Sequence, residues 1–128
     1  MTRTLAELNT RKASETPYTF ELLIDGQKTG VMLDVVGQQS ETFTNKATAI
    51  AKEYELAKGL ESDNPAAFLI SERTKLMTNK LVASRLIGWA GIKEEFSDDV
   101  ALELVSSNQD AFTQILEASN KIGNFIKL

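Results

Sequence analysis

The side chains of this sequence that could carry out acid–base or metal chemistry are carboxylates, because the chain has neither Cys nor His. Thiolate nucleophiles, disulfides, imidazole bases and most catalytic zinc sites are thereby excluded. The densest carboxylate cluster, which could hold a hard cation, comprises Glu94, Glu95, Asp98 and Asp99. It lacks the alternating Asp/Asn spacing and the distal Glu of a calcium loop. Ser97 can cap a helix whose first turn favours two acids, so we expect no metal, no cofactor and no catalytic residue. An enzyme that uses the carboxylates of residues 94–99 stays open as an alternative.

Length and charge narrow the class of protein further. The chain has 128 residues, of which 42% are hydrophobic, a length typical of one domain. Its net charge of −4 argues against nucleic acid as a partner, because such binding depends on clustered Lys and Arg. No apolar run is long enough for a secretory signal or a membrane span, so we expect a cytoplasmic protein without a membrane partner. Four basic residues are spaced so that they would lie mostly on the solvated surface of one predicted helix. They are Arg73, Lys75, Lys80 and Arg85.

The N-terminal third predicts an arm or a short helix over residues 1–17, followed by a β-hairpin over residues 18–36. Apolar and polar residues alternate from Tyr18, and the alternation resumes at Val31 after Asp25-Gly26 and Gly30. This spacing predicts a hairpin loop of about five residues. An isolated hairpin is marginally stable, so it must pack on helices or pair with another chain. Its predicted apolar face consists of Phe20, Leu22, Ile24, Val31, Leu33 and Val35.

Helical periodicity dominates the chain after Gly37. It predicts four helices, over about residues 41–58, 65–87, 98–106 and 109–126. We expect the first of them to end at Gly59, because glycine commonly follows the last helical residue. The predicted N-caps of the four helices are Ser40, Asn64, Ser97 and Asn108.

The segment Gly88-Trp89-Ala90-Gly91 is predicted to end the second helix. It lacks the Lys-Ser/Thr pair of a phosphate-binding loop, so we interpret its glycines as breaks between helices. Trp89 would fill the junction of neighbouring helices, although it could also bind a partner. The sequence as a whole predicts a mainly α fold of the α+β type. An N-terminal β-hairpin would precede a bundle of about four helices, in one domain of residues 18–128.

Two segments resemble a known protein family. Residues 30–43 are similar to the second strand, glycine and Ser-capped helix start of tail assembly chaperones of long-tailed (siphovirus-type) bacteriophages. Residues 86–97 resemble their Gly-Trp element, which is followed by Phe-Ser and the last helices. The likeness covers roughly residues 18–128. The residues that carry it are Gly37, Ser40, Gly88, Trp89, Phe96 and Ser97.

The resemblance implies a non-enzymatic factor of viral morphogenesis that acts in the host bacterial cytoplasm and is absent from the mature virion. Members of this family bind the tape measure protein, keep its long helices soluble and help to recruit the tail tube protein. They commonly form homo-oligomers, and the end of this sequence fits the shorter of the two products that many of them have. The alternative is a small structural virion protein, such as a head–tail joining or tail-completion protein.

A chaperone of apolar helices needs apolar side chains that its own core does not use. Such surface candidates lie on the second predicted helix and at the end of the chain. They could equally complete the core, and an unpaired edge of the hairpin is another candidate binding surface. The candidate partner-binding residues are Phe68, Ile70, Leu81, Val82, Phe125 and Leu128.

Overall fold

The computed structural model describes residues 2–60 and 67–127, and the side chains of residues 57–60 and 67–71 lie outside the description. The fold is α+β and helix-dominated, with a three-stranded antiparallel sheet of order β1-β2-β3. In chain order the elements are η1 (Ala6–Leu8), α1 (Thr10–Ala13), β1 (Tyr18–Ile24), β2 (Gln27–Val35), α2 (Glu41–Leu60), α3 (Ala67–Ala83), β3 (Leu86–Ala90), α4 (Asp98–Ser107), α5 (Gln109–Asn120) and η2 (Ile122–Asn124).

The predicted hairpin is confirmed as β1 and β2, but its loop is shorter than expected. β1 ends at Ile24 and β2 begins at Gln27, so the connection consists of Asp25 and Gly26. Both residues have positive φ, 51° and 75°, as the tight turns of hairpins require. The predicted five-residue loop is therefore wrong, because a two-residue turn matches the twist of the strands and lets pairing begin at once.

A third strand, β3, replaces the predicted end of the second helix. Leu86 pairs with Val35 and Trp89 pairs with Leu33, so β2 is the central strand of the sheet. Gly88 lies opposite Asp34, where an added Cβ would meet the Asp34 carboxylate at 3.2 Å. The prediction that the glycines are breaks between helices is wrong, because they allow a close approach of two strands.

The helix boundaries follow the predicted caps more closely than the predicted ends. The side chains of Ser40, Ser97 and Asn108 accept hydrogen bonds from backbone N–H groups three residues later, at 3.1, 3.2 and 3.0 Å. α2 runs to Leu60, so Gly59 lies inside it. α3 ends at Ala83 and α5 at Asn120, before the predicted residues 87 and 126. The predicted cap at Asn64 lies outside the described residues. No helix in the described ranges is both long and apolar enough to span a bilayer.

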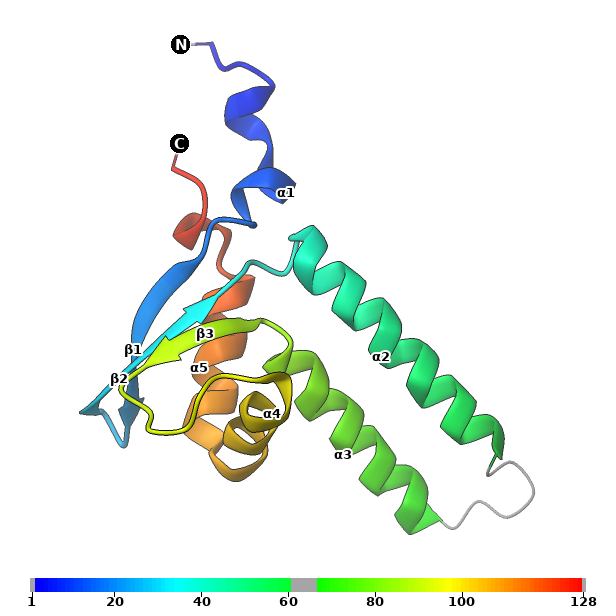
Figure 1. Cartoon of the computed structure of the whole chain (residues 1–128). Coiled ribbons are helices and arrows are strands. Elements are labelled where there is room, and N and C mark those ends of the chain that lie inside the picture. Colours follow the sequence, from blue (N-terminus) through cyan, green and yellow to red (C-terminus); the bar gives the residue numbers. More distant parts are fainter. Residues whose placement is uncertain (1, 61–66, 128) are drawn as a thin grey trace.

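The helices do not form the predicted four-helix bundle. α4, α5 and the end of α3 pack together and against the sheet, whereas α2 packs against α3 and projects from this body as a helical hairpin (Figure 1). None of the described α2 side chains, residues 41–56, is buried. The core therefore lies between the sheet and α3–α5. It contains Leu22, Leu33, Val35, Val82, Ala83, Leu86, Ala101, Val105, Ala111 and Ile115.

The end of the predicted N-terminal arm is part of the packed structure. Ser14 is fully buried, and its carbonyl accepts a 2.8 Å hydrogen bond from the Gly37 N–H. The next residue, Glu15, accepts hydrogen bonds from the backbone N–H and hydroxyl of Thr42, at 3.0 and 2.8 Å. These contacts attach residues 14–15 to the start of α2, while the first residues of the chain project above it (Figure 1).

Candidate protein-binding site

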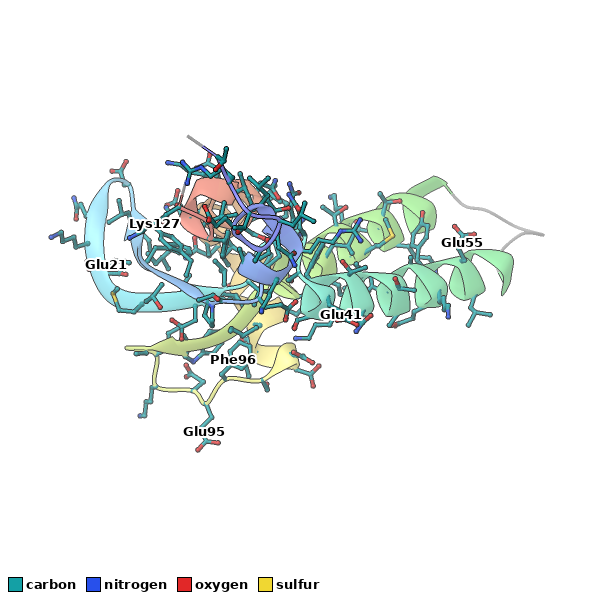
Figure 2. All side chains as sticks on the ribbon, turned by 90° about the horizontal axis from the view of Figure 1, so that it is seen from above. Glu21, Glu41, Glu55, Glu95, Phe96 and Lys127 are labelled. Carbon is teal, nitrogen blue, oxygen red and sulfur yellow. The ribbon has the colours of Figure 1, made fainter. Side chains whose placement is uncertain are left out.

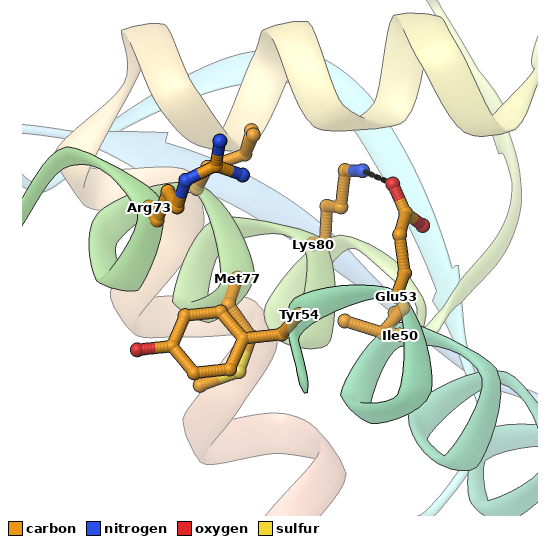
Figure 3. A pocket seen from close by; sticks show the side chains of 7 residues that line it. Ile50, Glu53, Tyr54, Arg73, Met77 and Lys80 are labelled. Atoms are coloured by element: carbon orange, nitrogen blue, oxygen red, sulfur yellow. Dashed lines mark hydrogen bonds and ion pairs between the residues drawn. The ribbon is translucent and has the colours of Figure 1, made fainter. Parts of the chain in front are cut away.

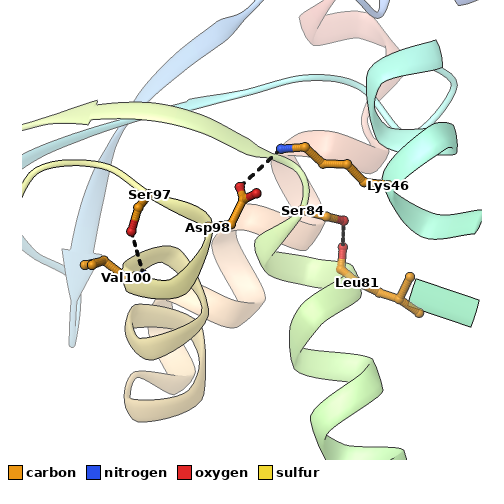
Figure 4. A network of polar contacts seen from close by, with 6 residues as sticks. All are labelled: Lys46, Leu81, Ser84, Ser97, Asp98 and Val100. Atoms are coloured by element: carbon orange, nitrogen blue, oxygen red, sulfur yellow. Dashed lines mark hydrogen bonds and ion pairs between the residues drawn. The ribbon is translucent and has the colours of Figure 1, made fainter. Parts of the chain in front are cut away.

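The carboxylates of residues 94–99 are arranged as a helix start and an ion pair. Ser97 caps α4, and Asp98 and Asp99 occupy its first turn, where the helix dipole favours acids. Asp98 Oδ1 lies 3.4 Å from Lys46 Nζ of α2 (Figure 4). Glu95 points away from the fold on the loop before α4 (Figure 2). Within the described ranges, no three His, Cys, Asp or Glu side chains are grouped so as to hold a metal ion.

Trp89 connects β3 to the loop that follows it. Its ring contacts Phe96 edge-to-face with 5.0 Å between the ring centroids, and its Nε1–H donates a 3.0 Å hydrogen bond to the Glu94 carbonyl. Gly91, with φ of 85°, allows the chain to turn next to the Gly30 carbonyl. Trp89 packs against the core and fixes the path from β3 to α4, but it does so from a strand, because residues 86–90 do not form the predicted helix end.

Gly37 and Ser40 shape the connection between β2 and α2. An added Cβ at Gly37 would lie 2.7 Å from the Ser14 Cβ, so the two segments touch at this point. Ser40 is buried and caps α2. The hydrogen bonds that Thr42 donates from the first turn of α2 lower the pKa of Glu15. These residues set the direction in which α2 leaves the sheet.

The predicted partner-binding residues fall into three groups. Val82 is 3% exposed and belongs to the core, so it is not a surface residue. Leu81 and Phe125 are partly buried, and Phe125 packs edge-on against Tyr18. The side chains of Phe68, Ile70 and Leu128 lie outside the described residues.

Other large apolar side chains, which the sequence did not indicate as surface residues, are exposed instead. Leu56 is 72% exposed; it follows the half-buried Tyr54 by two residues, about 200° further round the helix, and this spacing is the signal that could have identified it. Leu76 is 46% exposed on α3. Ile24 at one end of the hairpin is also exposed, as are Leu5 and Leu8 near the N-terminus.

A groove follows the contact between α2 and α3. Its outer part, which we call the outer groove, has an apolar lining of Ile50, Tyr54, Leu76 and Met77 (Figure 3). The Tyr54 hydroxyl lies 3.1 Å from the Thr74 hydroxyl. At the rim, Lys80 of α3 donates a 2.9 Å hydrogen bond to Glu53 of α2. The hollow has a volume of about 50 Å³, so with its apolar lining and charged rim it suits contact with a single apolar side chain of a partner helix.

The groove continues toward α4, where its walls come from three helices. This part, the inner groove, shares Ile50 and Lys80 with the outer groove, so the two are neighbours. Ion pairing between Lys46 and Asp98 bridges its walls (Figure 4). The inner groove is further lined by Ala49, Ala83, Ser84, Asp99 and Leu102.

Of the basic residues predicted on a solvated face of this helix, Lys75 is exposed, whereas Arg85, just beyond the end of α3, is buried. Arg85 is 8% exposed, and its guanidinium lies 4.2 Å from the centre of the Phe43 ring. Its Nη1 donates a 2.7 Å hydrogen bond to the Leu81 carbonyl, and burial lowers its pKa to about 10. Lys80 and Lys75 pair with Glu53 and Glu72. Arg85 therefore packs the base of α2 against the body.

The edges of the predicted hairpin are less available than expected. One side of β2 is paired with β3. On the outer side of β1, the Gln114 side chain accepts a 3.0 Å hydrogen bond from the Leu23 N–H and donates one of 2.7 Å to the Leu23 carbonyl. A partner strand that paired with Leu23 would have to displace this side chain. The groove is thus the better candidate for protein binding. Comparison with protein families, curated proteins and solved structures gives no match for this chain.

Proposed function

We propose that this protein is a tail assembly chaperone of a long-tailed bacteriophage. In this role it binds the tape measure protein, keeps it soluble in the host bacterial cytoplasm, helps to recruit the tail tube protein and leaves before the virion is complete. It forms homo-oligomers and acts by binding, without catalysis. The proposal rests on the resemblance of residues 30–43 and 86–97 to that family, and β2 and β3, which carry part of these segments, lie side by side.

The observation that carries a binding role is the exposure of the α2–α3 hairpin. α2 extends over Glu41–Leu60, yet none of its described side chains is buried, although Phe43, Ile50 and Tyr54 recur at helical spacing. Helices in water obtain most of their stability from packing an apolar face. A partner helix in the outer groove would complete that packing, and the long apolar helices of a tape measure protein are partners of the required kind.

Co-expression with fragments of the tape measure protein tests this function. We expect the wild-type chain to keep the fragments soluble and to co-purify with them. Leu76→Asp places a charge in the outer groove and should abolish both effects. Ile24→Asp is the matched control, because Ile24 is 44% exposed, close to the 46% of Leu76, but lies at the tip of the β-hairpin.

Two results would contradict the proposal. Fragments that stay insoluble beside the wild-type chain would exclude chaperone activity, and equal effects of Leu76→Asp and Ile24→Asp would exclude the outer groove as the binding site. Mass spectrometry of purified virions addresses the alternative. A head–tail joining or tail-completion protein would be present in fixed stoichiometry, whereas the chaperone should be absent.

A further inference from the structure

The first strand of the sheet is an edge strand whose sequence favours pairing with further strands. β1 lies at one end of the order β1-β2-β3, so one of its sides has no neighbouring strand. Its seven residues, YTFELLI, include one charged residue and neither Pro nor Gly. Segments of this length with high β-propensity and low charge readily stack with strands of other chains. An unprotected edge at β1 would therefore favour aggregation.

The helix α5 supplies a substitute for the missing neighbour. Gln114 Oε1 accepts a 3.0 Å hydrogen bond from the Leu23 N–H, and Gln114 Nε2 donates a 2.7 Å hydrogen bond to the Leu23 carbonyl. In an antiparallel sheet, two opposed residues exchange the same pair of N–H to carbonyl bonds. A carboxamide carries a donor and an acceptor side by side, so it can make both bonds at once. Gln114 thus bonds to Leu23 as a residue of a further strand would.

The contact lies at the apolar end of β1, next to the hairpin turn. Ile24, which follows Leu23, is 44% exposed, so this end of the strand would offer an apolar side chain to an incoming strand. One helical turn before Gln114, Asp110 Oδ2 accepts a 3.3 Å hydrogen bond from the Asp25 N–H. Residues four apart lie on the same face of a helix. One face of α5 therefore holds the end of β1 at two points.

We propose that Gln114 protects the β1 edge against strand addition, because its carboxamide occupies the hydrogen-bonding positions of Leu23 that another chain would need. A strand that pairs at Leu23 must first break two hydrogen bonds, and it forms no more than two in their place. The inference concerns aggregation of the chain at its sheet edge. It does not rest on the proposed role in tail assembly or on the homo-oligomers of that role.

Aggregation of the purified full-length chain tests this protection. Gln114→Leu replaces the carboxamide by an apolar group of similar size and removes both bonds to Leu23. We expect this variant to form sedimentable, thioflavin T-positive aggregates at least about tenfold faster than wild type, the effect of losing about one or two net hydrogen bonds. Gln109→Leu is the matched control, because Gln109 is the other glutamine of α5 and its amide bonds to Thr113 of the same helix, at 3.2 Å. Aggregation of Gln114→Leu no faster than that of wild type or of Gln109→Leu would overturn the proposal.

Hydrogen exchange of single amides separates protection of the edge from a general loss of stability. Leu33 lies in the central strand β2, where it pairs with residues of both neighbouring strands. In Gln114→Leu, the exchange rate of the Leu23 amide should rise at least about tenfold relative to that of the Leu33 amide. A parallel rise of both rates would mean that Gln114 acts through overall stability alone, and would refute the protection.

A second substitution on β1 identifies the strand that pairs. Lysine on an edge strand opposes strand addition, so Ile24→Lys added to Gln114→Leu should return the aggregation rate toward that of wild type. A double variant that aggregates as fast as Gln114→Leu alone would place the pairing outside β1 and contradict the proposal.

Discussion

The contact between Gly37 and Ser14 leads to a quantitative prediction for Gly37→Ala. The new Cβ would lie 2.7 Å from both the Cβ and the Oγ of Ser14 and 3.2 Å from its Cα. Carbon atoms in optimal contact are about 3.5–4.0 Å apart, so the segments must separate by about 1 Å. Ser14 is fully buried and bonded to the Gly37 N–H, which leaves little freedom to move. We expect a loss of about 1–3 kcal/mol in the free energy of unfolding, the usual cost of overpacking.

Urea denaturation followed by circular dichroism measures this change, and thermal unfolding should show a midpoint lowered by about 4–12 °C. Gly123→Ala is the control, because an added Cβ at Gly123 meets no atom within 4 Å. Its effect should stay within about 0.5 kcal/mol. Ser14→Gly removes the clashing atoms, so the double variant with Gly37→Ala should be less destabilised than the sum of the single changes. A Gly37→Ala variant as stable as wild type, or strictly additive effects in the double variant, would refute the reasoning.

Three further substitutions test other contacts of the fold. Arg85→Ala removes a buried cation–π contact with Phe43 and should lower the free energy of unfolding by about 2 kcal/mol in urea titrations. Glu15→Gln should weaken the pH dependence of stability. The lowered pKa of Glu15 stabilises the fold above its ordinary pKa of 4.5, and this contribution is lost as the pH falls through the folded-state value, as unfolding midpoints between pH 3 and 6 can show. Ser97→Ala removes the cap of α4 and should cost about 1 kcal/mol, measured by thermal unfolding.

Each of these expectations has an opposite outcome. A stable Arg85→Ala variant would mean that the stacked guanidinium contributes nothing beyond its own desolvation. If wild type and Glu15→Gln unfold at the same acid pH, the hydrogen bonds from Thr42 to Glu15 do not contribute to the stability of the fold. For Ser97, a Ser97→Asp variant is the control, because Asp can also cap a helix and should retain most of the stability. Equal losses in the Asp and Ala variants would argue against capping as the cause.

Local interactions explain which parts of the fold were predictable. The N-caps Ser40, Ser97 and Asn108 act on backbone groups three residues away, and the turn at Asp25-Gly26 depends on its own backbone angles. Such features depend on residues that are close together in the sequence. The hairpin and the starts of three helices could therefore be predicted. The place of Asp98 and Asp99 in the first turn after Ser97 was predictable for the same reason.

Contacts between residues distant in the chain decided the features that the sequence could not indicate: the third strand, the burial of Arg85 and the exposure of Leu76. Residues 86–90 carry a pattern that suits a helix end or a strand, and the choice depends on β2, about fifty residues earlier. The burial of Arg85 depends on Phe43, and the exposure of Leu76 on the departure of α2 and α3 from the body. The groove likewise exists only because α2, α3 and α4 converge on one place.

The sequence by itself determined the inventory of chemistry and the local elements, since these depend on which residues are present and on their near neighbours. A chain without Cys or His, with strong caps and alternating strands, specifies a helix-dominated α+β protein whose carboxylates are its acid–base groups. Only the tertiary structure decided which apolar side chains were left outside the core. Whether a side chain is buried depends on how segments distant in the chain pack together, and no pattern in the neighbouring residues indicates that packing.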